Sequence, residues 1–241
     1  MRILAIDSSG LVATVAILEK NSMLAEYTLN YKKTHSQTLL PMLDEIVKQL
    51  DFDLETIDAI AVAAGPGSFT GLRIGSATAK GLGLALDKPV IPVPTVDALA
   101  YNVWGVNDVV CPMMDARRNQ VYTGIYKFEK EFQVIMEQDA MDMGELIEKL
   151  NSMGERVIFL GDGVPVHEKL IAERMTVPYE LAPAHVNRQR AAVIATLGAQ
   201  YFAEGNIQDA AEHGPDYLRK SQAEREREEK EAKLAENRNN G

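Results

Sequence analysis

The feature that most constrains this fold is an internal repeat, because the second half of the chain follows the same pattern of residue types as the first. A shift of 108 residues places Asp7, at the end of the apolar run RILAID, on Asp115 in the segment MDARR. The same shift places ATVAILEK (13–20) on VYTGIYKF (121–128), with residue types matching better than identities. Self-similarity of this kind indicates a duplicated structural unit. We therefore expect two similar lobes that face each other across a cleft.

Each copy is predicted to contain three strands followed by a helix, a strand and a second helix. Apolar and alternating segments predict the strands, and apolar residues at helical spacing predict the helices. In the first copy the strands cover 2–7, 13–20, 24–30 and 58–65, the helices cover 36–50 and 68–87, and a further strand covers 89–93. In the second copy the later elements are a helix at about 142–151, a strand at 156–163 and a helix at about 165–174. The repeated order βββαβα predicts an α/β fold.

The predicted domains are an N-terminal lobe (1–102), a second lobe (103–186), and a C-terminal helix and extension (187–219). The helix, at 187–205, is expected to pack back on the first lobe. Residues 220–241 form a tail of acidic and basic residues with almost nothing apolar. Because such a segment has no face to bury, we expect it to be disordered, with a helix induced by a partner as the alternative.

Charge and residue counts exclude several classes of protein. The net charge of −10 argues against this chain alone binding nucleic acid, since that affinity comes largely from Lys and Arg. The single cysteine, Cys111, excludes an internal disulfide, and no two of the four histidines stand at metal-pair spacing. No apolar run approaches the ~20 residues of a membrane helix, and the N-terminal apolar stretch is too short for a secretory signal. We expect a cytoplasmic protein without a metal site of its own.

A glycine-rich loop, GPGSFTGLRIG (65–75), joins the strand 58–65 to the helix 68–87. Such a loop can hold a phosphate, because the amides at a helix N-terminus point outward and the helix dipole favours an anion. The segment lacks the GK[ST] of a Walker loop and is not the dinucleotide fingerprint. The other interpretation makes it a turn, with Ser68 as the cap of the helix.

The same helix carries a ridge of small residues, with Gly71, Gly75, Ala79 and Gly83 at successive i, i+4 positions. Each helical glycine costs about 1 kcal/mol relative to alanine. Something that needs close approach of the backbone should offset this cost. The residues leave open whether another element of this chain or a second chain lies against the ridge.

Two turns resemble those of the actin, sugar-kinase and Hsp70-like (ASKHA) superfamily, in which a nucleotide lies between duplicated lobes. One is AIDSS, which supplies Asp7, Ser8 and Ser9 as candidates to approach phosphates or a metal. The other is GDG, which supplies Gly161, Asp162 and Gly163 on the far side of the nucleotide. The alternative is that these residues simply make turns.

The order of five motifs is similar to that of the TsaB family, also called YeaZ. The motifs are AIDSS, THSQTLLP (34–41), AAGPGSFTGLRIG (63–75), MMDARRNQVY (113–122) and GDG. The resemblance runs from residue 1 to about 220. It implies a non-catalytic partner of TsaD, the subunit that transfers a threonylcarbamoyl group to the adenosine beside the anticodon of ANN-decoding tRNAs. It also implies an ATPase partner, TsaE, contact with tRNA only through the complex, and a homodimer when the chain is alone.

The resemblance further implies that the metal belongs to TsaD, which holds it with an HxxxH pair. The matching positions here are Asp97 and Tyr101, and tyrosine is a poor replacement for a neutral imidazole. We therefore expect no catalytic residue and no cofactor on this chain, with ATP or ADP binding weak at most. The main alternative is an independent ATP-dependent small-molecule kinase of the same superfamily, and a peptidase is a third possibility.

Docking on TsaD is expected to use helices of the N-terminal lobe, as the resemblance implies. The glycine ridge would then let two helices approach closely. The predicted partner-binding residues are Leu39, Leu43, Ile46, Gly71, Leu72, Gly75, Ala79 and Gly83.

Overall fold

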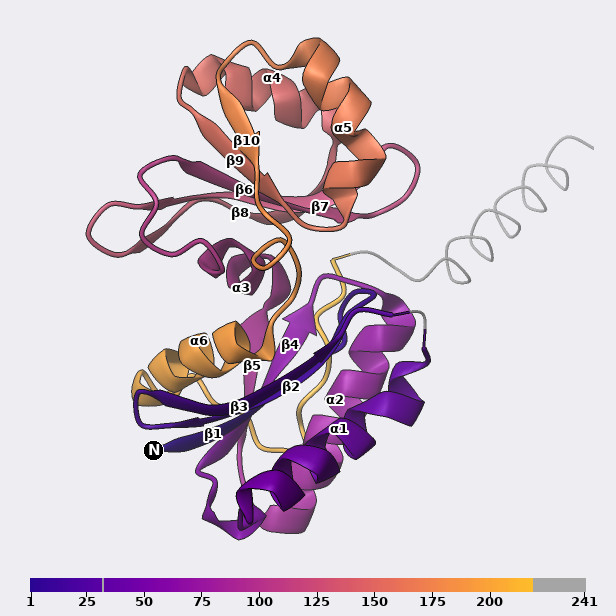
Figure 1. The fold of residues 1–241 in the computed structure, drawn as a ribbon, viewed down its shortest axis with the longest axis vertical. Coiled ribbons are helices and arrows are strands. Elements are labelled where there is room, and N and C mark those ends of the chain that lie inside the picture. Colours follow the sequence, from indigo (N-terminus) through magenta and orange to yellow (C-terminus); the bar gives the residue numbers. More distant parts are fainter. Residues whose placement is uncertain (32, 219–241) are drawn as a thin grey trace, which may run out of the picture.

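The computed structural model describes residues 1–31 and 33–218. It contains two lobes, each built on a five-stranded sheet (Figure 1). Both lobes follow the order βββαβα, so the duplicated α/β architecture predicted from the repeat is confirmed. The expectation of disorder in 220–241 lies outside the described residues.

The sheet of the first lobe has the strand order β3-β2-β1-β4-β5. Its strands are β1 (Arg2–Asp7), β2 (Ala13–Glu19), β3 (Ser22–Leu29), β4 (Ala59–Gly65) and β5 (Val90–Pro94). The first three form an antiparallel meander, whereas β4 and β5 run parallel to β1. Every residue of β4 is buried, as expected for a continuous apolar strand covered on both faces.

Helices cover both faces of this sheet, and the alternation along β1 shows how. Leu4 and Ile6 belong to a core with α1 (His35–Leu50) and α2 (Phe69–Leu86). Ile3 and Ala5 point to the other face and pack with α6 (Ala191–Ala203). A 3-10 turn, η1 (Leu54–Thr56), leads into β4. Figure 1 shows α6 on the opposite side of the sheet from α1 and α2.

The sheet of the second lobe has the order β10-β9-β6-β7-β8. Its elements are β6 (Val109–Asp115), β7 (Gln120–Phe128), β8 (Phe132–Asp142), α4 (Met143–Met153), β9 (Val157–Leu160), α5 (Gly163–Arg174) and β10 (Tyr179–Leu181). One face packs against α4 and α5. The other packs against α3 (Thr95–Tyr101), the short helix that joins the lobes.

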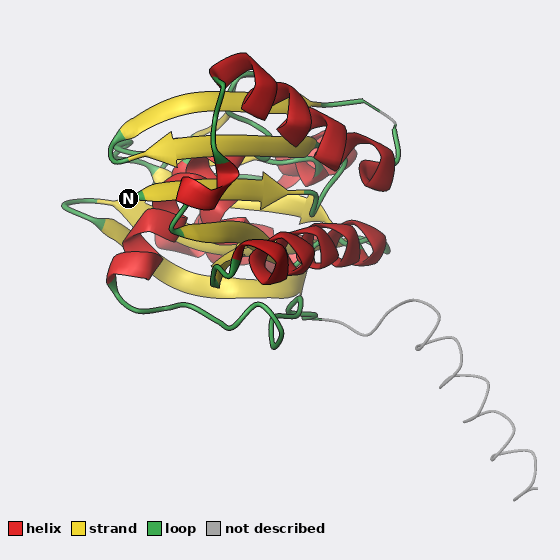
Figure 2. Ribbon diagram, turned by 90° about the horizontal axis from the view of Figure 1, so that it is seen from below, coloured by secondary structure: helices red, strands yellow, loops and turns green. Residues whose placement is uncertain are grey.

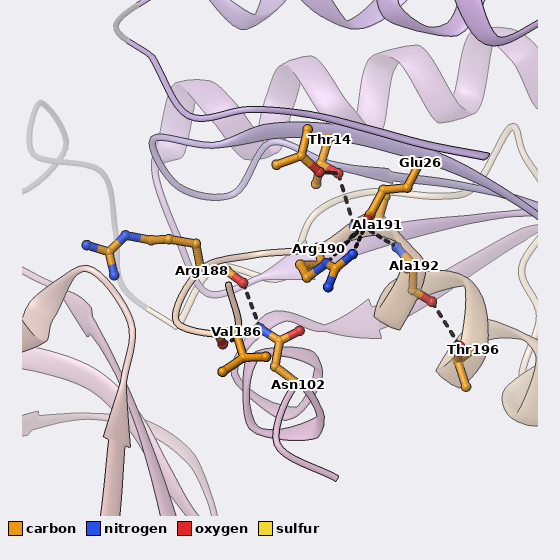
Figure 3. Close-up of polar contacts among 10 residues, drawn as sticks. Thr14, Glu26, Asn102, Val186, Arg188, Arg190, Ala191, Ala192 and Thr196 are labelled. Carbon is orange, nitrogen blue, oxygen red and sulfur yellow. Dashed lines mark hydrogen bonds and ion pairs between the residues drawn. The ribbon is translucent and has the colours of Figure 1, made fainter. Parts of the chain in front are cut away.

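A return segment connects the second lobe to α6 and ties the lobes together (Figure 3). The Asn102 amide donates to the carbonyls of Val186 and Arg188, at 3.0 and 2.6 Å. Arg190 forms an ion pair with Glu26 on β3, and the same carboxylate accepts the Ala192 amide at 3.0 Å. Because Arg190 is extended, with φ −139°, the helix begins at 191 rather than at the predicted 187.

After α6 the chain forms what we call the C-terminal strap, residues 206–218. Gln208 pairs with Val90 at the free edge of β5, through backbone hydrogen bonds of 3.0 and 2.8 Å. Figure 2 shows the segment after α6 as a loop along one side of the first lobe. The strap ends at the cleft between the lobes, where Asp216 and Tyr217 form part of the wall.

Candidate functional site

A cleft of about 570 Å³ lies between the lobes. The first lobe contributes the turn after β1 and the start of α2, and the second contributes the turn after β6 and the turn before α5. The polar and charged lining residues include Ser9, Lys33, His35, Asp115, Arg117, Asp162 and Asp216. The predicted cleft between two similar lobes is therefore present, and the strap forms a third wall that the sequence did not reveal.

The repeat extends to single hydrogen bonds at this cleft. The Asp7 carboxylate accepts the Ser9 amide at 2.8 Å, and the Asp115 carboxylate accepts the Arg117 amide at 2.8 Å. Each is an Asx turn at the end of the first strand of its lobe. The two differ in burial: Asp7 is 1% exposed, whereas Asp115 is partly exposed and pairs with the Arg117 guanidinium at 3.2 Å. Burial raises the pKa of Asp7 to about 6.

Of the predicted nucleotide residues in the first lobe, only Ser9 borders the cleft. The Ser8 hydroxyl donates to the Gly71 carbonyl at 2.8 Å, so it is engaged inside the lobe. The Asp7 side chain is buried, and its carboxylate accepts the Ser9 amide in the turn that follows β1. The Ser9 hydroxyl is buried and has no hydrogen-bond partner within the described part of the chain.

In the second lobe, only Asp162 of the GDG turn borders the cleft. Its carboxylate accepts the Asp115 amide at 3.2 Å, and burial raises its pKa. Gly161 has φ +110°, and a Cβ there would lie 2.1 Å from the Met113 carbonyl oxygen. Gly161 is therefore needed because the backbone of β6 lies too close for a side chain. This role is structural.

The glycine-rich loop wraps around the turn after β1. The Ser68 amide donates to the Ser9 carbonyl at 2.6 Å, and a Cβ on Gly67 would lie 2.4 Å from the same oxygen. The Ser68 hydroxyl accepts the Gly71 amide at 3.3 Å, so Ser68 is the N-cap of α2. These contacts support the interpretation as a turn with a Ser68 cap.

The prediction that the glycine ridge faces a second chain is wrong. A Cβ on Gly71 would lie 2.0 Å from the Ser8 carbonyl oxygen, and one on Gly75 would lie 2.6 Å from the Ser8 hydroxyl. Ala79 is fully buried, and a Cβ on Gly83 would lie 2.7 Å from that of Ala210 in the strap. The close approach that offsets the cost of these glycines is therefore made by the same chain.

The large residues predicted for docking are also core residues. Leu39, Leu43 and Ile46 of α1 and Leu72 of α2 are each at most 5% exposed. The reason is general: the most apolar stripe of an amphipathic helix faces its own core. The prediction that these four residues form an exposed docking surface is therefore wrong.

One accessible apolar surface of these helices is a groove of about 440 Å³ between α1 and α2, here called the α1–α2 groove. It is lined by His35, Ser36, Leu39, Leu40, Ile74, Ala77, Thr78, Gly81 and Leu82. Leu40 is 53% exposed, and the position of a Cβ on Gly81 is open space. Leu39 is the only predicted docking residue on its edge. Ala77 and Gly81, four residues apart, are the outward-facing small pair that sequence reasoning missed.

Asp97 and Tyr101 lie at the junction of the lobes rather than in the cleft. The Tyr126 hydroxyl donates to Asp97 at 2.7 Å, and burial raises the Asp97 pKa to about 6. The Tyr101 ring packs edge-on against Phe128 and Phe132, and its hydroxyl accepts the Gln200 amide at 3.2 Å. Over residues 1–31 and 33–218, no cluster of three or more His, Cys, Asp or Glu side chains is arranged to hold a metal ion.

Comparison with known proteins agrees with this architecture. The family model for TsaD, tRNA N6-adenosine threonylcarbamoyltransferase, matches residues 22–227. The tRNA threonylcarbamoyladenosine biosynthesis protein TsaB of Bacillus subtilis (strain 168) is 35% identical over 228 residues, covering 93% of this chain and 96% of that protein. The protein of the same name from Escherichia coli (strain K12) is 33% identical, covering 92% and 96%.

A solved structure extends the match to the fold. YeaZ from Pseudomonas aeruginosa superposes with a TM-score of 0.76 at 27% identity, covering 90% of this chain and 99% of that one. Relatives above 30% identity along almost the whole chain establish common descent, and the structural match agrees. The chain therefore belongs to the TsaB (YeaZ) family.

Proposed function

We propose that this chain is the scaffold subunit that works with TsaD and TsaE to form threonylcarbamoyladenosine beside the anticodon of ANN-decoding tRNAs. Family membership supports the pathway, since the relatives from B. subtilis and E. coli are named for threonylcarbamoyladenosine biosynthesis in tRNA. The observation that carries the scaffold role is the α1–α2 groove, an apolar surface with a half-exposed leucine, Leu40.

The side chains that could do chemistry support a non-catalytic role. The two positions that match the TsaD metal pair, Asp97 and Tyr101, are engaged by Tyr126 and Gln200. Cys111 is fully buried and its pKa is raised to about 12, so it is not available as a thiolate. The transfer reaction and its metal would then belong to TsaD.

We also propose that the chain works without a resident nucleotide. Ser8 is bonded to Gly71, and the carboxylate of Asp7 is buried under the turn that it stabilises. In the second wall of the cleft, the Asp115 carboxylate is paired with the Arg117 guanidinium at 3.2 Å, and the Asp162 carboxylate accepts the Asp115 amide, so these groups already have partners in the chain. Calorimetry of the isolated chain with ATP and with ADP is expected to give weak binding at most.

Docking is proposed to place TsaD on the α1–α2 groove, with a second copy of this chain taking that place when TsaD is absent. An apolar surface of this kind is stabilised by a partner that removes it from water. The net charge of −10 supports contact with tRNA only through the complex. We propose the cytoplasm as the place where this complex works. In the described residues, no helix has the length and apolar character to cross a membrane.

Reconstitution tests this function directly. TsaD, TsaE, ATP, threonylcarbamoyl-AMP and an ANN-decoding tRNA are combined with increasing amounts of this chain, and the modified adenosine is quantified. A scaffold gives a rate that rises and saturates near one chain per TsaD, and the chain alone turns over nothing. Modification that proceeds equally well without the chain contradicts the proposal. ATP turnover by the chain alone would instead support the small-molecule kinase.

A further inference from the structure

The C-terminal strap has two parts that are held very differently. The first part, 206–213, is built into the lobe: Gln208 exchanges two backbone hydrogen bonds with Val90, and Ala210 is buried against Gly83. His213 is 3% exposed, and its Nδ1 lies 2.9 Å from the side-chain oxygen of Gln208. This part is an anchor.

The second part, 214–218, rests on the surface. A Cβ on Gly214 would meet no heavy atom within 4 Å, and glycine tolerates a wider range of backbone angles than other residues, here with Pro215 directly after it. Beyond it, the Asp216 amide donates to the Ala64 carbonyl at 2.7 Å. The ring of Tyr217, which is 39% exposed, stacks on Phe69 at 4.9 Å between centroids. Within residues 1–31 and 33–218, one hydrogen bond and one ring contact thus hold the end of the strap.

The lobe is nevertheless shaped to receive this second part. Gly65, at the end of β4, has φ +131°, and a Cβ there would lie 2.2 Å from the Asp216 carbonyl oxygen. A side chain at this position would push the strap away. The Arg73 guanidinium lies 4.9 Å from the Phe69 centroid and adds a cation–π contact to the ring that Tyr217 covers.

Because Asp216, Tyr217 and Leu218 form one wall of the cleft between the lobes, the position of this segment sets how open the cleft is. We propose that residues 214–218 are a latch on the cleft, with the chain's own Tyr217 as the resident occupant of the Phe69 ring face. The latch swings about Gly214 while the anchor stays in place. This inference does not depend on the proposed function, because Phe69 and Tyr217 do not line the α1–α2 groove.

The contacts set the balance between closed and open forms. A neutral hydrogen bond and an aromatic pair together favour the closed form by roughly tenfold to a hundredfold. A ligand or partner that binds the Phe69 face needs only that much preference for the open form to displace the latch. The anchor, with two backbone hydrogen bonds at a sheet edge and two buried side chains, is expected to open far less often.

Residue-resolved amide hydrogen exchange on the full chain tests the latch. The Asp216 amide is expected to be protected roughly ten- to a hundredfold, and the Gln208 amide much more strongly. Tyr217→Ala should lower the protection at Asp216 by about tenfold and leave Gln208 unchanged. Tyr27→Ala, which removes a half-exposed ring from β3, is the control and should change neither.

Two outcomes overturn the proposal. The first is equal protection at Asp216 and Gln208 with loss of both together, which would make the strap one rigid unit. The second is an Asp216 amide that exchanges at the same rate in the Tyr217→Ala variant as in the parent chain.

Discussion

The Ser8 hydroxyl donates a 2.8 Å hydrogen bond to the carbonyl of Gly71, and the Ser8 carbonyl oxygen occupies the space where a Gly71 side chain would stand. The turn after β1 is thereby locked into the first turn of α2. This contact explains why the helix tolerates glycines that cost stability, and it leaves the opposite side of α2 as the surface that we propose for docking.

Two matched substitutions on α2 are expected to have opposite effects. Gly71→Ala places a methyl group against the Ser8 backbone and should lower the free energy of unfolding by about 1–3 kcal/mol. Gly81→Ala adds a methyl group in open space and should raise it by about 0.5–1 kcal/mol. Urea unfolding of both variants measures the difference. Equal stability of the two would mean that the ridge does not face the chain's own sheet.

Asp7→Asn is expected to stabilise the protein at neutral and alkaline pH. The folded-state pKa of Asp7, about 6, lies above its ordinary value of 3.8, so the folded state holds this proton more tightly than the unfolded state. The native carboxylate therefore costs stability above pH 6, and the cost disappears as the pH falls toward 4. Asparagine keeps the acceptor for the Ser9 amide, and the gain at pH 8 should be up to about 3 kcal/mol.

Unfolding of the Asp7→Asn variant and the parent chain across this pH range isolates the effect, because all other groups are common to both. If the difference in the free energy of unfolding between the two proteins stays constant from pH 4 to pH 8, the pKa of Asp7 is not raised in the folded state.

Tyr126→Phe is expected to destabilise the junction between the lobes. It removes the donor to Asp97, a buried carboxyl whose pKa is already raised to about 6. The loss should be about 1–3 kcal/mol at pH 8 and smaller at pH 5, where the carboxyl is protonated in the folded state. Tyr122→Phe, a change at a cleft residue, serves as the control and should remain within about 0.5 kcal/mol of the parent chain. If both variants lose the same stability, the Tyr126–Asp97 bond is not the cause.

The sequence predicted the fold because its evidence is local and repeated. The apolar run of residues 3–6 predicts a strand, which the structure buries on both faces, and the recurrence of Asp7 as Asp115 marks the duplication, which extends to the Asx turns. Such patterns need no knowledge of which distant segments meet.

The surfaces could not be predicted in the same way. Small residues four apart indicate close approach but not what approaches, and the contact of Gly71 with Ser8 joins positions that only the tertiary fold brings together. The helical spacing of Leu39, Leu43 and Ile46 marks the stripe that is buried, but it does not show that the neighbouring, half-exposed Leu40 borders a groove. The strap has no periodicity at all, and its pairing with Val90 uses backbone groups.

The proposed docking of TsaD on the α1–α2 groove can be measured as the affinity of purified TsaD for groove variants of this chain. Leu40→Arg and Gly81→Arg place a charge on exposed positions of the groove, and Leu181→Arg places the same charge on an exposed leucine of the second lobe. Each groove variant is expected to weaken TsaD binding by about tenfold or more, while Leu181→Arg binds like the parent chain. Unchanged affinity of both groove variants, with all three proteins folded, would contradict the proposed docking.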